Sequence, residues 1–313
     1  MSISNSILVA GMVKAPNTLD SGAPLISGSH SDIAAVLSSF AELGFENVEV
    51  HQGWVPFPDF DVEQSLKFRK ALTVSGVAAP SFTVARRSIL DPERGAENLD
   101  YTLKALEVVS DFGAQYLCVG LHPELTMAQL QAEYFWMEPG LADPTDSESW
   151  AQAVSGFQRI ADRAKELGIE ISLEIYEDTL LGASDSSLRL IQEIDRTNVG
   201  LNPDLGNLIR LDRAVEDWEE WLAKVLPFSN YWHVKNYTRV ETQYGFRTEP
   251  STMEEGFMDY LAAFRMANDI GFSGPIICEH YSHDPMPVLR ANLEFTKRVA
   301  QELTDSESKV SSK

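Results

Sequence analysis

Four residues with side chains that commonly bind metals each close a short apolar run of the sequence. The runs are IEISLE, VGLNPD, YWH and PIICE, and they end at Glu174, Asp204, His233 and Glu279, which are 30, 29 and 46 residues apart. Each interval is about the length of one βαβ repeat or one enlarged repeat. Because the active site of an α/β barrel lies at the carboxyl ends of its strands, this spacing predicts that all four residues meet at one mouth of a barrel.

Three carboxylates gathered at one mouth would repel one another unless a cation lay between them. Each pair about 4 Å apart would cost roughly 4 kcal/mol at an effective dielectric constant of about 20. A divalent cation removes this cost, and a set of three carboxylates and one imidazole suits hard metal ions. We therefore expect one divalent metal ion as cofactor, with Mn²⁺ preferred and Mg²⁺, Co²⁺ or Zn²⁺ as alternatives.

The elements that must position these residues follow an alternating pattern. Eight short apolar or β-branched runs predict strands, and the stretches between them carry apolar residues at helical spacing. The predicted strands span residues 7–13, 47–51, 77–84, 115–121, 169–175, 199–204, 230–236 and 275–280. Three predicted helix exits, in ELGFENVEV, ELGIEISLE and DIGFSGPIICE, place a glycine shortly before the next strand. Eight such units, with no Gly-rich phosphate loop after the first strand, predict a (β/α)8 TIM barrel of the α/β class.

The length of the chain, 313 residues, fits a single barrel domain, since such barrels commonly use about 250 residues. We expect this domain to span residues 1–303 and a polar, disordered C-terminal tail to span residues 304–313. Two insertions should follow the fourth and seventh strands, at residues 134–150 and 240–257. Both would lie on the active-site side, where they could form a lid or an aromatic platform for a ligand, or else an oligomer contact.

Composition limits the classes of partner. The formal net charge of −22 is spread along the chain, and it opposes binding to nucleic acid backbones or anionic membranes. No apolar run approaches the roughly 20 residues needed to span a bilayer, and the first residues lack the pattern of a signal peptide, so we expect a cytoplasmic protein. The two cysteines, Cys118 and Cys278, lie in apolar runs and are interpreted as buried thiols.

The segment HVKN, at residues 233–236, resembles the HLKD motif of the xylose isomerase-like barrels, and the likeness covers about residues 5–300. This family includes sugar phosphate isomerases and epimerases, ketose 3-epimerases and inositol-catabolic enzymes. The resemblance implies that Glu174, Asp204, His233 and Glu279 bind one divalent metal. Tyr176, Asn207 and Asn236 depart from the family pattern, and they argue against the trinuclear-zinc DNA repair endonucleases of this fold, which need additional histidine ligands.

The resemblance to the epimerases also implies catalytic roles. Glu174 and Glu279 would approach opposite faces of the substrate, where one abstracts a proton and the other returns it. The metal would act as a Lewis acid on a carbonyl and the adjacent hydroxyl and stabilise an enediolate. Lys235 lies two positions after His233 on the same side of its strand, so it could neutralise an oxyanion. A structural ion pair inside the barrel is the equally weighted alternative for this lysine.

Five further residues are candidates for binding the substrate: His51, Trp54, Arg86, His122 and Asn236. His51 and His122 end the second and fourth strands, so either could bind a sugar hydroxyl or act as a base. Either Arg86 or its neighbour Arg87 could hold an anionic group, although adjacent arginines are often solvated loop residues. A structural role is the alternative for each histidine.

These observations favour a metal-dependent carbohydrate isomerase or epimerase that abstracts a proton next to a carbonyl. A lyase is the second hypothesis, because the same proton abstraction leads to β-elimination from a 3-oxo-glycoside, as in the large subunits of C-glycoside deglycosidases. A barrel that binds sugar or forms a scaffold without catalysis is the third, and a nucleic-acid enzyme is the least favoured. We expect a small-molecule sugar ligand and an oligomer, with a small second subunit in the lyase case.

Overall fold

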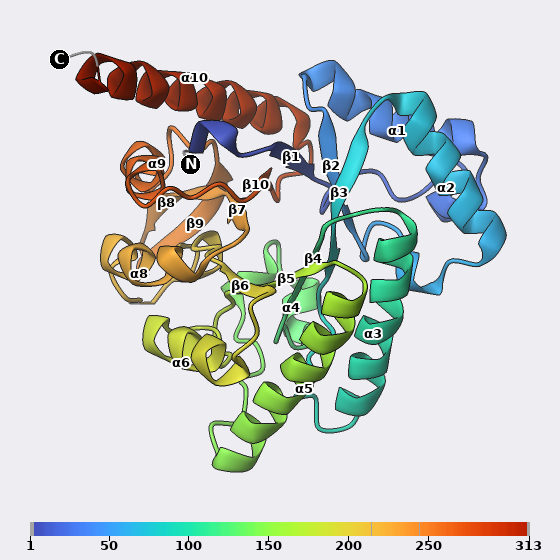
Figure 1. Ribbon diagram of the computed structural model, residues 1–313, viewed down its shortest axis with the longest axis horizontal. Helices are drawn as coiled ribbons and strands as arrows, with labels where there is room; N and C mark the ends of the chain where they lie inside the picture. Colours follow the sequence, from blue (N-terminus) through green and yellow to red (C-terminus); the bar gives the residue numbers. More distant parts are fainter. Residues whose placement is uncertain (1–2, 214, 244, 312–313) are drawn as a thin grey trace.

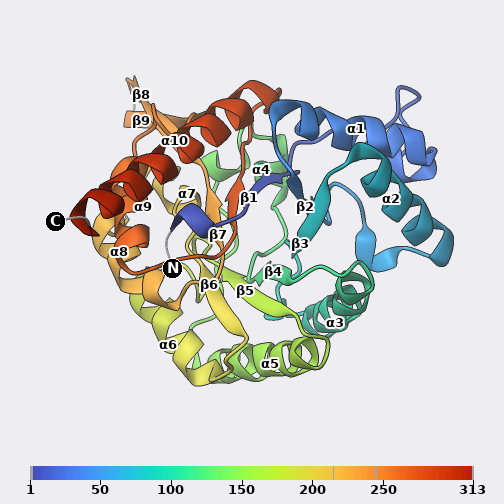
Figure 2. The same cartoon turned by 45° about the horizontal axis from the view of Figure 1, so that its top comes forward.

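Eight parallel strands form the centre of the molecule, and helices surround them (Figures 1 and 2). The computed structural model describes residues 3–213, 215–243 and 245–311. The strands of the barrel are β1 (Leu8–Gly11), β2 (Asn47–His51), β3 (Ala78–Val84), β4 (Tyr116–Gly120), β5 (Glu170–Glu174), β6 (Val199–Asn202), β7 (Trp232–Val234) and β10 (Ile276–Cys278). Each lies inside one of the eight predicted runs, so the predicted TIM barrel is confirmed.

Helices alternate with these strands along the chain. The α-helices are α1 (His30–Leu43), α2 (Val62–Ser75), α3 (Gly95–Asp111), α4 (Met127–Gln131), α5 (Ser147–Glu166), α6 (Ser184–Ile194), α7 (Gly206–Ile209), α8 (Trp218–Val225), α9 (Tyr260–Asp269) and α10 (Met286–Ser311). Short 3₁₀ turns occupy η1 (Ile3–Asn5), η2 (Leu25–Ser27), η3 (Phe57–Asp59), η4 (Phe135–Met137) and η5 (Leu226–Phe228). The three predicted helix exits are confirmed, since Gly44, Gly168 and Gly271 all have positive φ angles. None of these helices is long and apolar enough to cross a bilayer.

The order of the strands in the sheet is β6, β5, β4, β3, β2, β1, β10, β7, so the barrel has a seam between β6 and β7. Across this seam the described residues form an isolated bridge, between Leu201 and Ser229, instead of a ladder. The side chain of Asn202 partly replaces the ladder, because its Oδ1 accepts a hydrogen bond of 2.7 Å from the backbone N–H of His233. The seam is therefore held by side chains as well as by backbone.

Two apolar clusters fill the molecule. The large one packs the helices against the strands, and a small separate one contains Val9, Cys118, Tyr231 and Ile277. Several strand residues that are fully or almost fully buried are polar instead: Glu49, Ser81, Thr83 and Ser172. Both cysteines are buried free thiols, as predicted. Because buried polar groups need partners, their presence on the strands indicates a functional site inside the barrel.

The two predicted insertions take different forms. The one after β4 contains η4 and leads into α5. The one after β7 is an antiparallel hairpin of β8 (Asn236–Thr242) and β9 (Gly245–Ser251), outside the barrel sheet. Helix α10 continues through residues 304–311, so this part of the expected disordered tail is helical; residues 312 and 313 lie outside the described residues. Helical propagation from a well-packed helix extends past the point where apolar periodicity ends.

Candidate metal centre and active site

The four residues predicted to bind metal lie together around the imidazole of His233, in β7. Its Nδ1 atom is 3.6 Å from Oε1 of Glu174, 3.4 Å from Oε1 of Glu279 and 3.9 Å from Oδ2 of Asp204. Glu174 ends β5, while Asp204 and Glu279 follow β6 and β10 directly. All four side chains are buried, and the most exposed of them, Glu174, has 6% of its surface accessible. The structure therefore places four side chains from four strands at the carboxyl end of the barrel.

Glu49, in β2, is a member of this site that the sequence reasoning missed. Its Oε2 is 3.0 Å from Nε2 of His233 and also accepts a hydrogen bond from the Tyr231 hydroxyl. A carboxylate behind a metal-binding histidine fixes the ring and its tautomer. Although burial opposes it, the charges of Glu279, Glu49 and Glu174 hold the pKa of His233 well above its ordinary value. The missed signal was a charged residue between Val48 and Val50 in a predicted strand.

The donor set fits a divalent cation. The Nδ1 atom of His233 and the Oδ1 atom of Asp204 are buried and have no hydrogen-bond partner among the described residues. The pKa of Asp204 is raised to about 7: burial is the main cause, the charge of Lys235 opposes the rise, and the negative charges of Glu174 and Glu279 add to it. Buried unpaired acceptors and crowded carboxylates are costly without a cation. Three carboxylates and one imidazole nitrogen would hold a hard divalent ion.

The thiol of Cys118 lies beside the same group. Its sulfur is 3.9 Å from Oε2 of Glu174, and it accepts a contact of 3.4 Å from the Asn202 amide. Cys118, Glu174 and His233 could together offer atoms to a metal, as could Glu49, His233 and Glu279. Burial raises the pKa of the Cys118 thiol well above its ordinary value. A protonated thiol is a poor metal ligand, so the oxygen-rich set is the better candidate.

Lys235 lies inside the barrel rather than in solvent. Its ammonium is 2.6 Å from Oε2 of Glu279 and also pairs with Asp204, and the side chain is 1% exposed. A side chain at Gly206 would collide with the Lys235 stem, so the glycine makes room for the lysine. The structural ion pair, which was the alternative for this lysine, is present. Its contact with a substrate oxyanion stays a prediction.

Asn207 holds two of the candidate ligands in place. Its Nδ2 atom is 2.9 Å from Oε1 of Glu174 and 3.1 Å from Oδ2 of Asp204. The same atom is also 2.8 Å from the carbonyl of Ile175. An amide donor here orients carboxylates without adding a metal ligand, which agrees with a site for one ion.

Of the two candidate histidines, His122 lies closest to the four ligands. Its Nε2 is 3.4 Å from Oε2 of Glu174, and its buried Nδ1 has no partner among the described residues. A Cβ atom at Gly120 would lie 2.6 Å from the His122 ring, so this strand end needs glycine. The ring also meets Tyr176 edge to face, with centroids 4.5 Å apart. The predicted contact of His122 with a substrate therefore remains consistent with its place.

His51 lies at the same end of the barrel. Its Nδ1 accepts a 3.0 Å hydrogen bond from the backbone N–H of Gly53. Burial is the main cause that lowers the pKa of His51, and the charges of Glu49 and Glu279 oppose this effect. The contact of His51 with a sugar hydroxyl stays a prediction.

Two predicted substrate-binding residues have structural contacts instead. The indole of Trp54 donates a 2.8 Å hydrogen bond to the carbonyl of Pro16 and packs against Phe68, with ring centroids 5.8 Å apart. The amide of Asn236 donates to the carbonyls of Met253 and Met258 and accepts from two backbone N–H groups. Both polar ends of Asn236 therefore order the loop after β9, and its contact with a substrate stays a prediction. Trp54 is likewise part of the apolar core.

Arg86 follows β3 and reaches toward the end of β5. Its guanidinium donates a 2.6 Å hydrogen bond to the Tyr176 hydroxyl and a 3.1 Å hydrogen bond to the carbonyl of Pro123. Its neighbour Arg87 turns away and lies over Tyr101, 4.4 Å from the ring centroid. Sequence reasoning left the choice between these arginines open, and the structure brings Arg86 next to Tyr176.

The two insertions meet above the candidate metal ligands. Trp136 packs edge to face on Tyr237 and Tyr281, with centroids 5.3 and 5.7 Å apart, and its indole donates a 3.1 Å hydrogen bond to the Thr248 hydroxyl. Tyr281 lies between Trp136 and Lys235, whose ammonium is 5.0 Å from the Tyr281 ring centroid. The aromatic segment after β4 therefore contacts the hairpin after β7, and the role of the two insertions, as a lid, an aromatic platform or an oligomer contact, stays a prediction.

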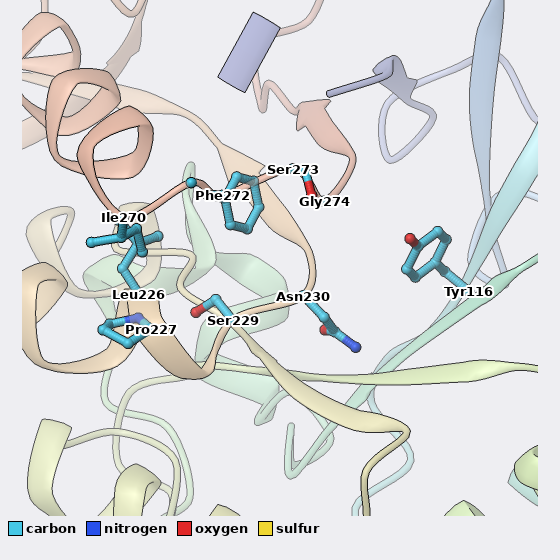
Figure 3. A pocket seen from close by; sticks show the side chains of 10 residues that line it. Tyr116, Leu226, Pro227, Ser229, Asn230, Ile270, Phe272, Ser273 and Gly274 are labelled. Atoms are coloured by element: carbon cyan, nitrogen blue, oxygen red, sulfur yellow. The ribbon is translucent and has the colours of Figure 1, made fainter. Parts of the chain in front are cut away.

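A separate pocket of about 390 Å³ lies at the opposite end of the barrel (Figure 3). Tyr116 at the start of β4, Asn230 just before β7 and Gly274 just before β10 line it. These positions mark the amino ends of the strands. Because barrel enzymes build their active sites at the carboxyl ends, this pocket is a less suitable catalytic site than the buried cluster around His233.

The barrel and its mixed carboxylate and imidazole cluster define a class of α/β barrels with a polar site at the strand ends. Residues 37–299 match the model of the family described as "Xylose isomerase-like TIM barrel", and the chain belongs to this family.

Two solved structures and one sequence relative illustrate the likeness. A xylose isomerase-like TIM barrel protein from Mycobacterium smegmatis in complex with magnesium is 33% identical, with a TM-score of 0.89 and coverage of 97% of this chain and 99% of that chain. A ketose 3-epimerase from Arthrobacter globiformis is 25% identical over 251 residues, which are 77% of this chain and 75% of the relative. A D-allulose 3-epimerase from Methylomonas sp. shares the fold at a TM-score of 0.70 and 17% identity, covering 96% of this chain and 100% of that one.

Proposed function

We propose that the protein is a carbohydrate epimerase or isomerase that depends on a divalent metal and abstracts a proton next to a carbonyl group. The observation that carries this proposal is the approach of Glu174 and Glu279 to one atom, Nδ1 of His233, at 3.6 and 3.4 Å. They come from β5 and β10, on the two sides of the seam between β6 and β7. The epimerase activities of the relatives support the same class.

Glu174, Asp204, His233 and Glu279 would hold the metal, which supplies Lewis-acid polarisation of a substrate carbonyl and the adjacent hydroxyl. A hard ion is the best match to this donor set, and we retain Mn²⁺ as the first choice. The magnesium bound by the relative from Mycobacterium smegmatis supports an ion of this kind.

The Oε2 atoms of Glu174 and Glu279 have different partners. Oε2 of Glu279 accepts from the Lys235 ammonium at 2.6 Å, while Oε2 of Glu174 faces Nε2 of His122 at 3.4 Å. One of the two glutamates would take the proton from the carbon, and the other, once protonated, would deliver a proton to the opposite face. Trp136 and Tyr281 would exclude bulk water during this step.

The test is deuterium exchange with a panel of ketoses and 3-oxo-glycosides in D₂O, after the bound metal has been quantified. We expect metal-dependent incorporation at one carbon and a rearranged sugar, detected by NMR and mass spectrometry. Glu279→Gln should lower the exchange rate by about 10²-fold or more, the scale of general acid–base catalysis. Glu294→Gln, on the exposed face of α10, is the matched control and should exchange normally.

Other outcomes select other functions. Release of an aglycone from a 3-oxo-glycoside would replace the proposal by the lyase hypothesis. Metal binding without any exchange would favour a binding role or the need for a second subunit. Neither metal nor exchange would refute the four-ligand interpretation.

A further inference from the structure

Two arginines share the same pair of aromatic rings beside the candidate metal centre. The guanidinium carbon of Arg86 is 4.9 Å from the Phe135 ring centroid and 4.8 Å from that of Tyr176. The guanidinium carbon of Arg210, which follows α7, is 4.7 Å and 5.3 Å from the same two centroids. Two cations that approach the same rings from separate loops therefore lie close together at the mouth of the barrel.

Arg210 has buried hydrogen-bond capacity that the described chain does not use. The side chain is 1% exposed, and its Nη2 donates to both oxygens of Glu177 at 2.8 Å. Its Nε and Nη1 atoms have no partner among the described residues. Guanidinium carries five N–H donors in a fixed plane, and three of them belong to these two atoms. Buried donors without an acceptor are costly, so a ligand acceptor at this place would remove a penalty.

Charge points to the kind of acceptor. Arg86 and Arg210 contribute two positive charges, and Glu177 offsets one of them. Arg86 gives its described hydrogen bonds to neutral oxygens, the Tyr176 hydroxyl and the Pro123 carbonyl. Its backbone has a φ angle of 57°, a left-handed conformation that is unfavourable for arginine and often marks functional positions. An oxyanion would match the remaining positive charge better than a neutral hydroxyl.

A short series of contacts connects this arginine pair to the metal ligands. Tyr176 meets His122 with centroids 4.5 Å apart, and Nε2 of His122 is 3.4 Å from Glu174. The unpartnered buried hydroxyl of Tyr237 also lies nearby, since Tyr237 and Arg210 both contact Trp136. The arginines are thus separated from the metal centre by about the width of two aromatic rings. A sugar held at the metal could reach them with its far end.

We propose that Arg86 and Arg210 form a subsite for an oxyanion, a carboxylate or a phosphate, carried by the end of the sugar remote from the reacting carbons. This inference rests on the proposed function, because it assumes that the reacting end binds at the metal centre. Phe135 lies against both guanidiniums and Trp136 against that of Arg210, so the segment after β4 must move aside when the ligand enters. The protein is then selective for acidic or phosphorylated ketoses over neutral ones.

The experiment compares three ketoses that differ only at carbon 6: D-fructose, D-fructuronate and D-fructose 6-phosphate. The metal-loaded protein is titrated calorimetrically with each, and exchange in D₂O is followed in parallel. At least one charged ketose should bind at least tenfold more tightly than D-fructose, and the preferred one identifies carboxylate or phosphate as the natural group. In Arg86→Gln the dissociation constant of that ligand should rise about tenfold or more, while that of D-fructose stays within about twofold.

Arg87→Gln is the matched control, because Arg87 lies next in the chain but stacks on Tyr101. Arg210→Lys, which keeps a charge for Glu177, should lose the same selectivity, and thermal melting checks that each variant is folded. Equal binding of all three ketoses, no binding of any, or an equal loss for all three in Arg86→Gln would overturn the subsite. Exchange of D-fructose without charge selectivity would leave the proposed function intact, and charge-selective binding without exchange would refute only that function.

Discussion

Glu49 is the residue whose role in the candidate site is most sharply defined by its contacts. It is fully buried, it faces Nε2 of His233 at 3.0 Å, and the opposite nitrogen of that ring faces the three candidate carboxylate ligands. We expect Glu49→Gln to weaken metal binding by about 10- to 100-fold, the usual effect of losing a carboxylate behind a ligating histidine. Calorimetric titration of the metal-free protein with Mn²⁺ or Mg²⁺ measures this constant directly.

The control for this variant is Glu46→Gln, one residue before β2 and exposed to solvent. This variant makes the same chemical change three residues before Glu49, outside the site. Its metal affinity should equal that of the unmodified protein. An affinity of Glu49→Gln within twofold of normal would mean that Tyr231 and Asn202 alone orient the histidine.

Single residues at strand ends were predictable where the chemistry is carried by residue type and spacing. The four candidate metal ligands lie together because each stands at or just after the carboxyl end of a barrel strand, and these ends meet at one mouth. They are Glu174, Asp204, His233 and Glu279. Arg210 was not predictable, since an isolated arginine after a short helix has no distinctive pattern. Glu49 was missed although a charged residue between Val48 and Val50 of a predicted strand was a signal. The described contacts of Trp54, with Pro16 and Phe68, are structural, and its contact with a substrate stays a prediction.

At the scale of elements, the sequence predicted the strands better than the insertions. HVKN was assigned to one strand through residue 236, but β7 ends at Val234 and Asn236 begins β8. No glycine or proline lies between Val234 and Val240, so the end of β7 leaves no turn signal in the sequence. It is instead enforced by Asn236, whose amide binds the backbone at Met253 and Met258.

The segment between β4 and α5 contains a partly buried carboxyl group, that of Asp143, which contacts the segment after β5. Asp143 accepts a 2.8 Å hydrogen bond from the backbone N–H of Leu180, and burial raises the pKa of its carboxyl from 3.8 to about 6. Between about pH 4 and pH 6 the folded chain holds a proton that the unfolded chain has lost, so this group destabilises the fold as pH rises through that window. Above about pH 6 the cost is constant.

Asp143→Asn should therefore raise the free energy of unfolding by about 1 kcal/mol at pH 7.5, after allowance for partial exposure of the carboxylate, and leave it nearly unchanged at pH 4. Denaturant titrations of both proteins at the two pH values measure the difference. Asp100→Asn, at an exposed position of α3, serves as control. A loss of stability at pH 7.5 would show that the hydrogen bond to Leu180 outweighs the burial cost.

At the scale of the whole molecule, the candidate metal ligands lie on both sides of the seam between β6 and β7, where the described barrel strands form no ladder. Asp204 follows β6 and His233 lies in β7. In the described residues these two strands form no ladder, and β6 has only an isolated bridge to Ser229, which precedes β7. The opposite wall, β2 with β3, is paired over most of the length of β2. A cation bound by Asp204 and His233 would connect residues about 30 positions apart across the seam, where backbone hydrogen bonds are fewest.

Metal binding should therefore stabilise the barrel unevenly. We expect a saturating divalent ion to slow hydrogen exchange of the backbone amides in β6 and β7 by at least about tenfold, equivalent to about 1.4 kcal/mol, and to change exchange in β2 and β3 much less. Exchange followed by mass spectrometry on metal-free and metal-loaded protein resolves the two regions. In Asp204→Asn the extra protection should disappear, because the ligand on the β6 side is lost. Equal protection of both walls would instead mean that the ion stabilises the fold as a whole and that Asn202 already closes the seam.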